Sequence, residues 1–326
     1  MGGRRKSRGR AVDGVFLLNK PSGISSNFAL QQVRRIYGAA KAGHTGALDP
    51  LATGMLPVCL GEATKFSQHL LDSDKRYLTT AKLGIRTDSS DADGKVIEEK
   101  PVPDDITAEQ IEGLLLAHFS GEIEQVPSMF SALKHQGQPL YKLARQGIQV
   151  EVKSRKVTIH EIKLTGFRGD ELDLEVYCSK GTYIRSIVED LGLLLGCGAH
   201  VKMLHRLDVG EFKSEQMMTL DSLRAKVPEN ADEDAQKGIQ IELDKLLLPA
   251  WAAVADMPSI KLDQQQTALI LQGRSIAQTE YDEGTQLRVF SAAEESAIER
   301  FLGVAIVDEG GALKPKRLIC TEADQN

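Results

Sequence analysis

The chain has 326 residues, with 40 Lys and Arg against 46 Asp and Glu, and a formal net charge of −6. That length suits about two domains, and 41% hydrophobic with 26% charged residues is a globular composition, which excludes a disordered or collagen-like chain. The longest nearly apolar stretch, residues 246–255, is far shorter than the roughly 20 residues of a transmembrane helix, so a membrane-spanning helix is also excluded.

Cysteine usage and the N-terminus predict the compartment. The four cysteines, Cys59, Cys178, Cys197 and Cys320, form no CxxC pair, so the sequence indicates neither a zinc ribbon nor a disulfide framework. The apolar run at 15–18 is too short for the core of a secretory signal. We therefore expect a reducing, cytoplasmic location.

Charge is distributed unevenly along the chain. Residues 1–226 carry a net charge of +3 and residues 227–326 a net charge of −9. The first ten residues contain five bases and no acid: Arg4, Arg5, Lys6, Arg8 and Arg10. This arm, residues 1–12, is either a solvated tail or a segment that contacts phosphates. The total charge therefore does not decide between nucleic acid and other partners.

In chain order, residues 14–20 predict a short buried strand that stops at Pro21. Ser25 and Ser26 can cap a helix whose apolar residues recur at helical spacing. A loop rich in Gly, Thr and Pro follows at 43–54. Further strands are predicted at 55–60, 77–83, 157–164 and 172–177, and helices at 106–119 and 182–195.

Residues 128–147 mix aromatic side chains with three bases, Lys134, Lys142 and Arg145. Such interleaving is typical of a surface that follows a nucleic-acid strand. An amphipathic helix with a partly exposed loop would give the same pattern.

The C-terminal part differs in composition. Residues 227–248 contain the acidic run 232–234 and a Pro near each end, which predicts a linker. Strands predicted at 286–290 and 302–308 indicate a small β-rich domain over 249–326.

Standard metal, P-loop and dinucleotide motifs are absent, so we expect no metal and no cofactor, and ordinary side chains must carry any chemistry. Asp49 is the first candidate. Its loop is dense in Gly and apolar residues, and Pro50 biases Asp49 to an extended backbone. A poorly solvated carboxylate needs a cationic partner and can then act as nucleophile or base. The alternative is an Asx turn in which Asp49 caps its own backbone.

Arg185 is the second candidate. It follows a strand and a Gly turn and falls in the first turn of the predicted helix 182–195. A cation is unfavourable at that end of a helix unless a carboxylate pairs with it. The alternative is an ordinary surface arginine.

Several ordered blocks closely resemble the bacterial TruB family of tRNA pseudouridine synthases, which act on the T loop. Four blocks carry the resemblance: Asn19–Gly23, Ala42–Pro57, Asp74–Tyr77 and Ser179–Arg185. Three further blocks match in the same order: Gly61–Lys65, Gln125–Ser128 and Leu195–His200. The resemblance covers residues 13–220 and weakens beyond them.

The resemblance implies a fold and its division. We expect an α+β pseudouridine synthase fold, with a central mixed or antiparallel sheet flanked by helices, over residues 13–248. It includes an RNA-binding insertion at about 125–153. A PUA-like β-rich domain at 249–326 completes the chain.

The resemblance also implies residue roles. Asp49 matches the essential aspartate, which attacks either C6 of the uracil or C1′ of the ribose, and both routes stay open. Arg185 matches the arginine that pairs with this aspartate and lowers its pKa. Tyr77 matches the aromatic residue that stacks on the target base, with a further role as a base in the rearrangement.

Four kinds of substrate-binding residue follow from the same resemblance. His44 matches the histidine that inserts into the T loop when bases flip out. Leu204 matches a pocket-lining leucine, and Lys20 belongs to a Lys-Pro motif as a support. The bases of the insertion are expected to contact the T arm.

The predicted function is isomerisation of the uridine at tRNA position 55 to pseudouridine. The expected partner is the tRNA T arm, with no guide RNA, no obligate protein partner, no membrane and a monomeric state. Two alternatives remain: the same chemistry on another RNA, or an RNA-binding tRNA-folding chaperone.

Overall fold

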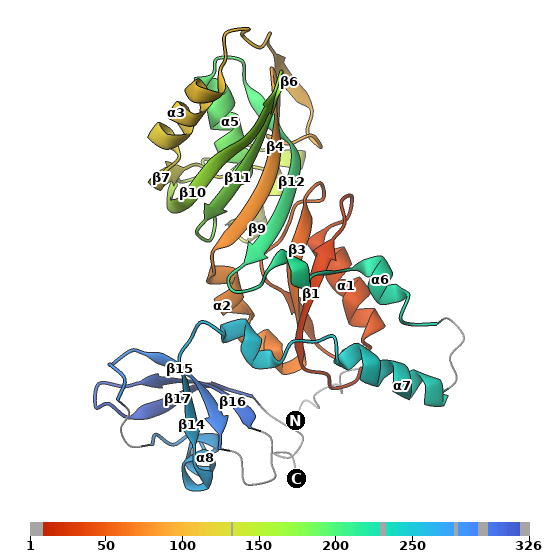
Figure 1. The fold of residues 1–326 in the computed structure, drawn as a ribbon, viewed down its shortest axis with the longest axis vertical. Helices are drawn as coiled ribbons and strands as arrows, with labels where there is room; N and C mark the ends of the chain where they lie inside the picture. The colour runs from red at the N-terminus through yellow and green to blue at the C-terminus, as the bar shows by residue number, and fades with distance from the viewer. Residues whose placement is uncertain (1–8, 132, 229–232, 277–279, 293–298, 320–326) are drawn as a thin grey trace.

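The computed structural model describes residues 9–131, 133–228, 233–276, 280–292 and 299–319 (Figure 1). Within them the strands form one sheet of nine strands, one of four and two of two strands each. No helix in these ranges has the length and apolar character that crossing a membrane requires. The predicted basic residues Arg4, Arg5, Lys6 and Arg8 lie outside the described residues.

The nine-stranded sheet is mixed. Its order is β13-β1-β3-β12-β4-β11-β10-β7, and β2 pairs with β3. The β1/β13 and β3/β12 pairs are parallel and the other pairs are antiparallel. The strands of this sheet are β1 Gly14–Lys20, β2 Ala42–His44, β3 Thr53–Leu60, β4 Lys75–Leu83, β7 Gly121–Gln125, β10 Arg155–Arg168, β11 Glu171–Cys178, β12 Ala199–Val209 and β13 Met218–Thr219.

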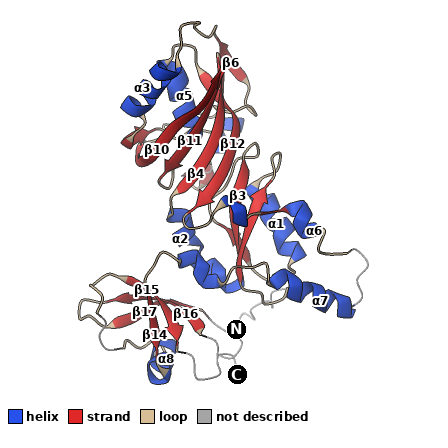
Figure 2. Cartoon of the chain, in the orientation of Figure 1, coloured by secondary structure: helices blue, strands red, loops and turns tan. Residues whose placement is uncertain are grey.

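Helices cover the sheet, as Figure 2 shows for α3 and α5, which lie side by side against the β4–β12 half. Helices α1 and α6 lie beside β1 and β3. The helices are α1 Ser26–Ile36, α2 Ser67–Asp72, α3 Ala108–His118, α4 Leu140–Arg145, α5 Ile184–Leu194, α6 Leu220–Arg224, α7 Glu233–Asp244 and α8 Gln264–Leu271. Ser25 accepts a hydrogen bond from the Phe28 N–H and caps α1, as its sequence predicts.

Strand β1 is apolar on both faces because each face meets a different core. Phe16 and Leu18 pack into the cluster under α1, α3 and α5. Val15 and Leu17, which alternate with them, pack into a second cluster that includes Phe66. The structure has two units: a large unit built on the nine-stranded sheet and a C-terminal unit built on the four-stranded sheet. The second cluster also contains side chains of the C-terminal unit, so the two units share a core.

The described residues of the C-terminal unit, 249–326, form a four-stranded sheet and the eight-residue helix α8. Its strands are β14 Ser259–Leu262, β15 Gln286–Ser291, β16 Arg300–Val307 and β17 Leu313–Leu318. The two-stranded ribbons are β5 Ile85–Thr87 with β6 Val96–Glu99, and β8 Lys134–His135 with β9 Gln138–Pro139. The predicted α+β class, with a mixed sheet, flanking helices and a small β-rich C-terminal part, is confirmed.

The predicted linker at 227–248 is wrong for its described part, which contains helix α7. The end of this helix packs on the large unit: Leu243 is buried, and its carbonyl accepts a hydrogen bond from the Tyr37 hydroxyl at 3.1 Å. Asp244 pairs with Arg10 at 2.5 Å, so Arg10 is tied to the fold. The acidic run at 232–234 was the reason for predicting a linker, although the residues that follow it in the chain have apolar side chains at helical spacing.

Strand β12, which the sequence analysis did not predict, joins the two halves of the sheet. It pairs with β3 only at His205↔Thr53 and Arg206↔Gly54. Gly54 has a φ of +97°, and a Cβ there would lie 2.2 Å from the Arg206 carbonyl oxygen, so this close approach requires glycine. The loop that carries Asp49 enters β3 at this junction.

Candidate active site

The Asp49 loop connects β2 to β3 and is held from the protein interior. The Lys20 ammonium donates hydrogen bonds to the carbonyl oxygens of Pro50 (3.3 Å) and Ala52 (2.7 Å). Ser26 accepts a bond from the Leu48 N–H and donates one to the Leu48 carbonyl. Because its backbone is fixed on both sides, the loop presents the Asp49 side chain in a defined position.

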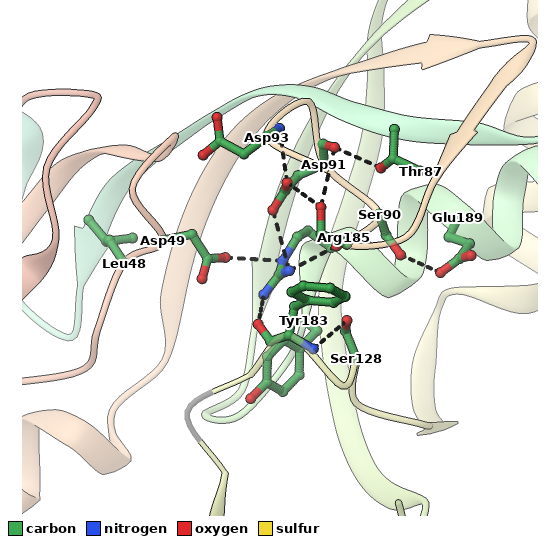
Figure 3. A network of polar contacts seen from close by, with 12 residues as sticks. Leu48, Asp49, Thr87, Ser90, Asp91, Asp93, Ser128, Tyr183, Arg185 and Glu189 are labelled. Carbon is green, nitrogen blue, oxygen red and sulfur yellow. Dashed lines mark hydrogen bonds and ion pairs between the residues drawn. The ribbon is translucent and has the colours of Figure 1, made fainter. Parts of the chain in front are cut away.

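Arg185 lies in the first turn of α5 and is 3% exposed, so it is not a surface arginine. Its Nε lies 3.0 Å from Asp49 Oδ2. Its Nη1 donates to the Ser89 carbonyl at 2.8 Å, and its Nη2 donates to the Phe130 carbonyl at 2.9 Å. These contacts fix the guanidinium plane and give Asp49 a charged partner instead of the Asx turn (Figure 3).

A second carboxylate, which the sequence analysis missed, completes the group. Asp91 Oδ2 lies 3.3 Å from Arg185 Nη1, and Asp91 is 5% exposed. Its Oδ1 accepts hydrogen bonds from the Ser89 hydroxyl (2.7 Å) and the Asp93 N–H (3.1 Å). Figure 3 shows Asp49 and Asp91 on the same guanidinium. The sequence signal that could have indicated this carboxylate is the Asp-rich segment 88–93, which precedes Gly94.

These side chains lie at a pocket of about 250 Å³. Asp49 and Arg185 line it together with Tyr77 and Leu204, so four of the predicted residues converge. The other lining residues are Gly46, Ala47, Leu48, Leu71, Lys75, Ser131, Arg155, Ser179, Gly181, Thr182, Tyr183, Ile184 and Arg206.

Burial and the Arg185 charge act in opposite directions on the pKa of Asp49. Burial raises the pKa of Asp49 above its ordinary 3.8, the Arg185 charge opposes this, and the Asp91 charge adds to it. The lowering effect of Arg185 that the resemblance implies is present, and burial outweighs it, so the net direction is upward. A raised pKa makes the carboxylate more basic and more nucleophilic than a surface aspartate.

The pocket wall under Tyr77 contains two buried cations. The Lys75 ammonium donates to the Leu70 (3.2 Å) and Leu71 (2.7 Å) carbonyls, and burial lowers the pKa of Lys75 to about 8. Arg206 donates to the Gly46 carbonyl at 3.1 Å and so holds the Asp49 loop from this side. Burial raises the pKa of Tyr77, and the Arg206 charge partly opposes it.

His44 and Lys20 are not among the pocket-lining residues. His44 ends β2, and burial together with the Arg206 charge lowers its pKa, so the ring is neutral near pH 7. Lys20 is 0% exposed, and its three hydrogen bonds go to backbone carbonyls. These contacts agree with the support role expected for Lys20, because they hold the backbone of the Asp49 loop, and a direct contact with substrate stays a prediction.

The insertion between β7 and β10 brings its three predicted bases to the surface. Lys134 on β8 and Lys142 and Arg145 on α4 are exposed. Arg145 lies over the Tyr141 ring at 5.7 Å, so a base and an aromatic ring are paired here.

Among the described residues, no three His, Cys, Asp or Glu side chains are grouped to hold a metal ion.

Family models match most of the chain. The model of the TruB family pseudouridylate synthase N-terminal domain matches residues 34–184. The tRNA pseudouridylate synthase B C-terminal domain matches 185–255, and the C-terminal model of pseudouridine synthase II TruB matches 258–319.

Curated relatives match over nearly their whole length. The tRNA pseudouridine synthase B of Vibrio campbellii (strain ATCC BAA-1116) is 54% identical, covering 97% of this chain and 98% of that protein. The tRNA pseudouridine synthase B of Shewanella sp. (strain ANA-3) is 52% identical, covering 97% and 96%.

Solved structures agree in fold. An H/ACA RNP bound to a substrate RNA containing 2′-deoxyuridine gives a TM-score of 0.69 at 22% identity, covering 98% of this chain and 92% of that chain. A Cbf5-Nop10-Gar1 complex gives 0.67 at 23% identity, covering 95% and 84%. The family models and the curated relatives, together with this fold, define the class, the pseudouridine synthases. Within that class, the chain belongs to the TruB family of pseudouridylate synthases.

Proposed function

We propose that this protein converts a uridine in the T loop of tRNA, at tRNA position 55, to pseudouridine. The relatives named tRNA pseudouridine synthase B support tRNA as the substrate class. The observation that carries the proposal is the Asp49 carboxylate, held 3.0 Å from buried Arg185 at the wall of a pocket. A carboxylate in this setting can attack an electron-poor carbon and leave again.

The reaction is an isomerisation whose atoms and electrons balance. The N1–C1′ bond of uridine breaks, the uracil turns, and a C5–C1′ bond forms. C5 loses its proton and N1 gains one, so no oxidant or reductant is needed. Asp49 attacks either C6 of the base or C1′ of the ribose, and its position at the pocket serves both routes.

Arg185 positions the attacking carboxylate. Its Nε takes one Asp49 oxygen, while Asp91 and two backbone carbonyls hold the rest of the guanidinium. The cation stabilises the ionised form of Asp49 against the effect of burial. The carboxylate is thereby available and aimed before substrate enters.

For Tyr77 we propose the stacking role. Burial raises the pKa of this phenol, which disfavours the phenolate that a base would need. A neutral ring on the pocket wall offers an aromatic face to a uracil instead. Leu204, on the same wall, supplies apolar contact.

We further propose how the RNA outside the pocket is held. The exposed bases of residues 125–153 contact phosphates of the T arm, and neutral His44 fills the space left by the flipped bases. Residues 249–326 act as a PUA-like RNA-binding domain. We also propose that the protein acts as a monomer, without guide RNA or partner protein, in the cytoplasm where tRNA resides.

Tritium release from a T-arm stem-loop carrying 5-tritiated uridine tests the proposal. The wild-type protein should release tritium, and Asp49→Asn should abolish release while RNA affinity stays within about tenfold, since one contact is worth about 1 kcal/mol. Asp221→Asn, a change at an exposed carboxylate on α6, is the matched control. Equal turnover by Asp49→Asn, or a preference for rRNA fragments over the stem-loop, would contradict the assignment.

A further inference from the structure

The Ser131 hydroxyl is a buried polar group in the pocket wall with no protein partner. Ser131 lies between β7 and β8 in the insertion and is 2% exposed. Within the part of the chain that the structure describes, no donor or acceptor lies at hydrogen-bond distance from its Oγ. Buried hydroxyls in proteins are normally hydrogen-bonded. Its place on the same pocket as Asp49 therefore calls for a functional explanation.

The backbone around Ser131 is held on both sides. The Phe130 carbonyl, one residue before it, accepts the Nη2 bond of Arg185 at 2.9 Å. The Ser131 carbonyl accepts the Tyr141 N–H at 3.0 Å. Ser128 Oγ accepts the Phe130 N–H at 3.1 Å, which closes the turn seen in Figure 3. The hydroxyl is thus placed by contacts that run directly to the Asp49–Arg185 pair.

Several other polar groups of the pocket already have protein partners. Asp49 and Arg185 bind each other, and the Lys75 ammonium binds backbone carbonyls. The Thr182 hydroxyl donates to the Ser179 carbonyl at 2.9 Å. The Ser131 hydroxyl can both donate and accept and uses neither capacity within the described protein. A hydrogen bond from this hydroxyl to an incoming ligand would break no existing protein hydrogen bond.

We propose that Ser131 is a substrate-contact residue whose hydroxyl hydrogen-bonds the flipped target uridine, at a uracil carbonyl or at the ribose 2′-hydroxyl. The inference rests on the proposed function and adds a residue to it. Uridine presents both kinds of oxygen, and one serine hydroxyl can serve either. Because the contact comes from the insertion, it links docking of the T arm on residues 125–153 to seating of the base at Asp49.

The test compares Ser131→Ala with Ser154→Ala, a change at an exposed serine just after the insertion. With the T-arm stem-loop, kcat/KM of Ser131→Ala should fall about tenfold through loss of one hydrogen bond. Its melting temperature should match that of the wild type, since no protein hydrogen bond is removed. Ser154→Ala should retain wild-type kcat/KM.

A stem-loop with 2′-deoxyuridine at the target identifies the bonded oxygen. The affinities of wild type and Ser131→Ala are compared on the uridine and on the 2′-deoxyuridine stem-loop. If Ser131 binds the 2′-hydroxyl, wild type binds the uridine RNA more tightly than Ser131→Ala does, and this difference disappears on the 2′-deoxyuridine RNA. If Ser131 binds a uracil carbonyl, the difference persists in full. Equal kcat/KM for wild type and Ser131→Ala on the uridine substrate would overturn the inference. Failure of the wild type itself to release tritium would instead overturn the proposed function.

Discussion

The Nη1 atom of Arg185 lies 3.3 Å from the carboxylate of Asp91, on the same guanidinium whose Nε pairs with Asp49. One cation therefore serves two carboxylates of different exposure: Asp91 is buried, whereas the Asp49 side chain is 37% exposed. The buried partner fixes the arginine, and the more exposed one faces the pocket. A functional separation follows, in which Asp91 acts through Arg185 and Asp49 meets the substrate.

Asp91→Asn is predicted to lower kcat about tenfold, a barrier increase of about 1.4 kcal/mol, while KM for the T-arm RNA changes little. Asparagine keeps the shape of Asp91 but loses the charge that holds Arg185. Single-turnover and steady-state kinetics on the stem-loop check this. Asp93→Asn, which leaves the Asp93 backbone contact with Asp91 in place, is the control. If Asp91→Asn instead raises KM by a larger factor than it lowers kcat, Asp91 serves RNA binding.

The pH dependence of activity should reflect the raised pKa of Asp49. Attack requires the carboxylate, so log kcat/KM should rise with pH through a pKa above the ordinary 3.8 and then level off. The Asp91 charge contributes to the elevation, so Asp91→Asn should shift this acidic limb to lower pH. A pH–rate profile of both proteins measures the shift. An unchanged limb would mean that another group controls the profile.

The contribution of Asp49 to folding stability changes with pH in the direction opposite to that of activity. A carboxyl whose pKa is raised by folding stabilises the folded state below its unfolded pKa, and this stability is lost as pH rises through the folded pKa. Asp49→Asn removes that pH dependence. The melting temperature of Asp49→Asn relative to wild type should therefore increase as pH rises above 3.8, although the variant is inactive.

Local patterns predicted much of the fold. Apolar runs and the Ser25 cap predicted β1, β3, β4, β10, β11, α1, α3 and α5 in place. The same patterns failed for β12 because Lys202, His205 and Arg206 interrupt its alternation. Arg206 is nevertheless 2% exposed, since the Met55 and Gly46 carbonyls take its donors. Arg206 is buried because β3 lies beside β12. The sequence of β12 alone does not reveal which strand will lie beside it.

The site was predictable where the sequence is distinctive. Asp49, Tyr77 and Arg185 lie in motif blocks, Leu204 was named from its position in the resembling family, and all four converge on one pocket. Asp91 was missed because its role exists only once the β5–β6 turn reaches the start of α5. The Ser131 hydroxyl was missed for a related reason: its lack of a partner is a property of the folded wall, and a serine in a loop is ordinary in sequence.

Arg185→Lys is predicted to reduce kcat by at least about a hundredfold, because lysine keeps the charge but loses the planar fork. Four acceptors surround the guanidinium, two carboxylates and two carbonyls, and an ammonium cannot reach all of them. Tritium release measures the loss, and far-ultraviolet circular dichroism checks the fold. Arg224→Lys, at a half-exposed surface pair, is the control. Wild-type turnover by Arg185→Lys would show that charge alone suffices.

Phe301→Ala is predicted to loosen the C-terminal unit. Phe301, on β16, is 7% exposed, and its ring lies 5.5 Å from Phe66 of the large unit and 5.3 Å from Phe290. Removing a buried ring costs about 3–5 kcal/mol, and here the cavity opens in the core that both units share. Urea unfolding should show a lower midpoint, and limited proteolysis should cut near residues 255–258. Because the Asp49 pocket contains no residue of this core, Phe301→Ala should retain kcat at low temperature on the minimal stem-loop. A large loss of kcat under those conditions would mean instead that packing of the C-terminal unit is transmitted to Asp49 through β1 and β3.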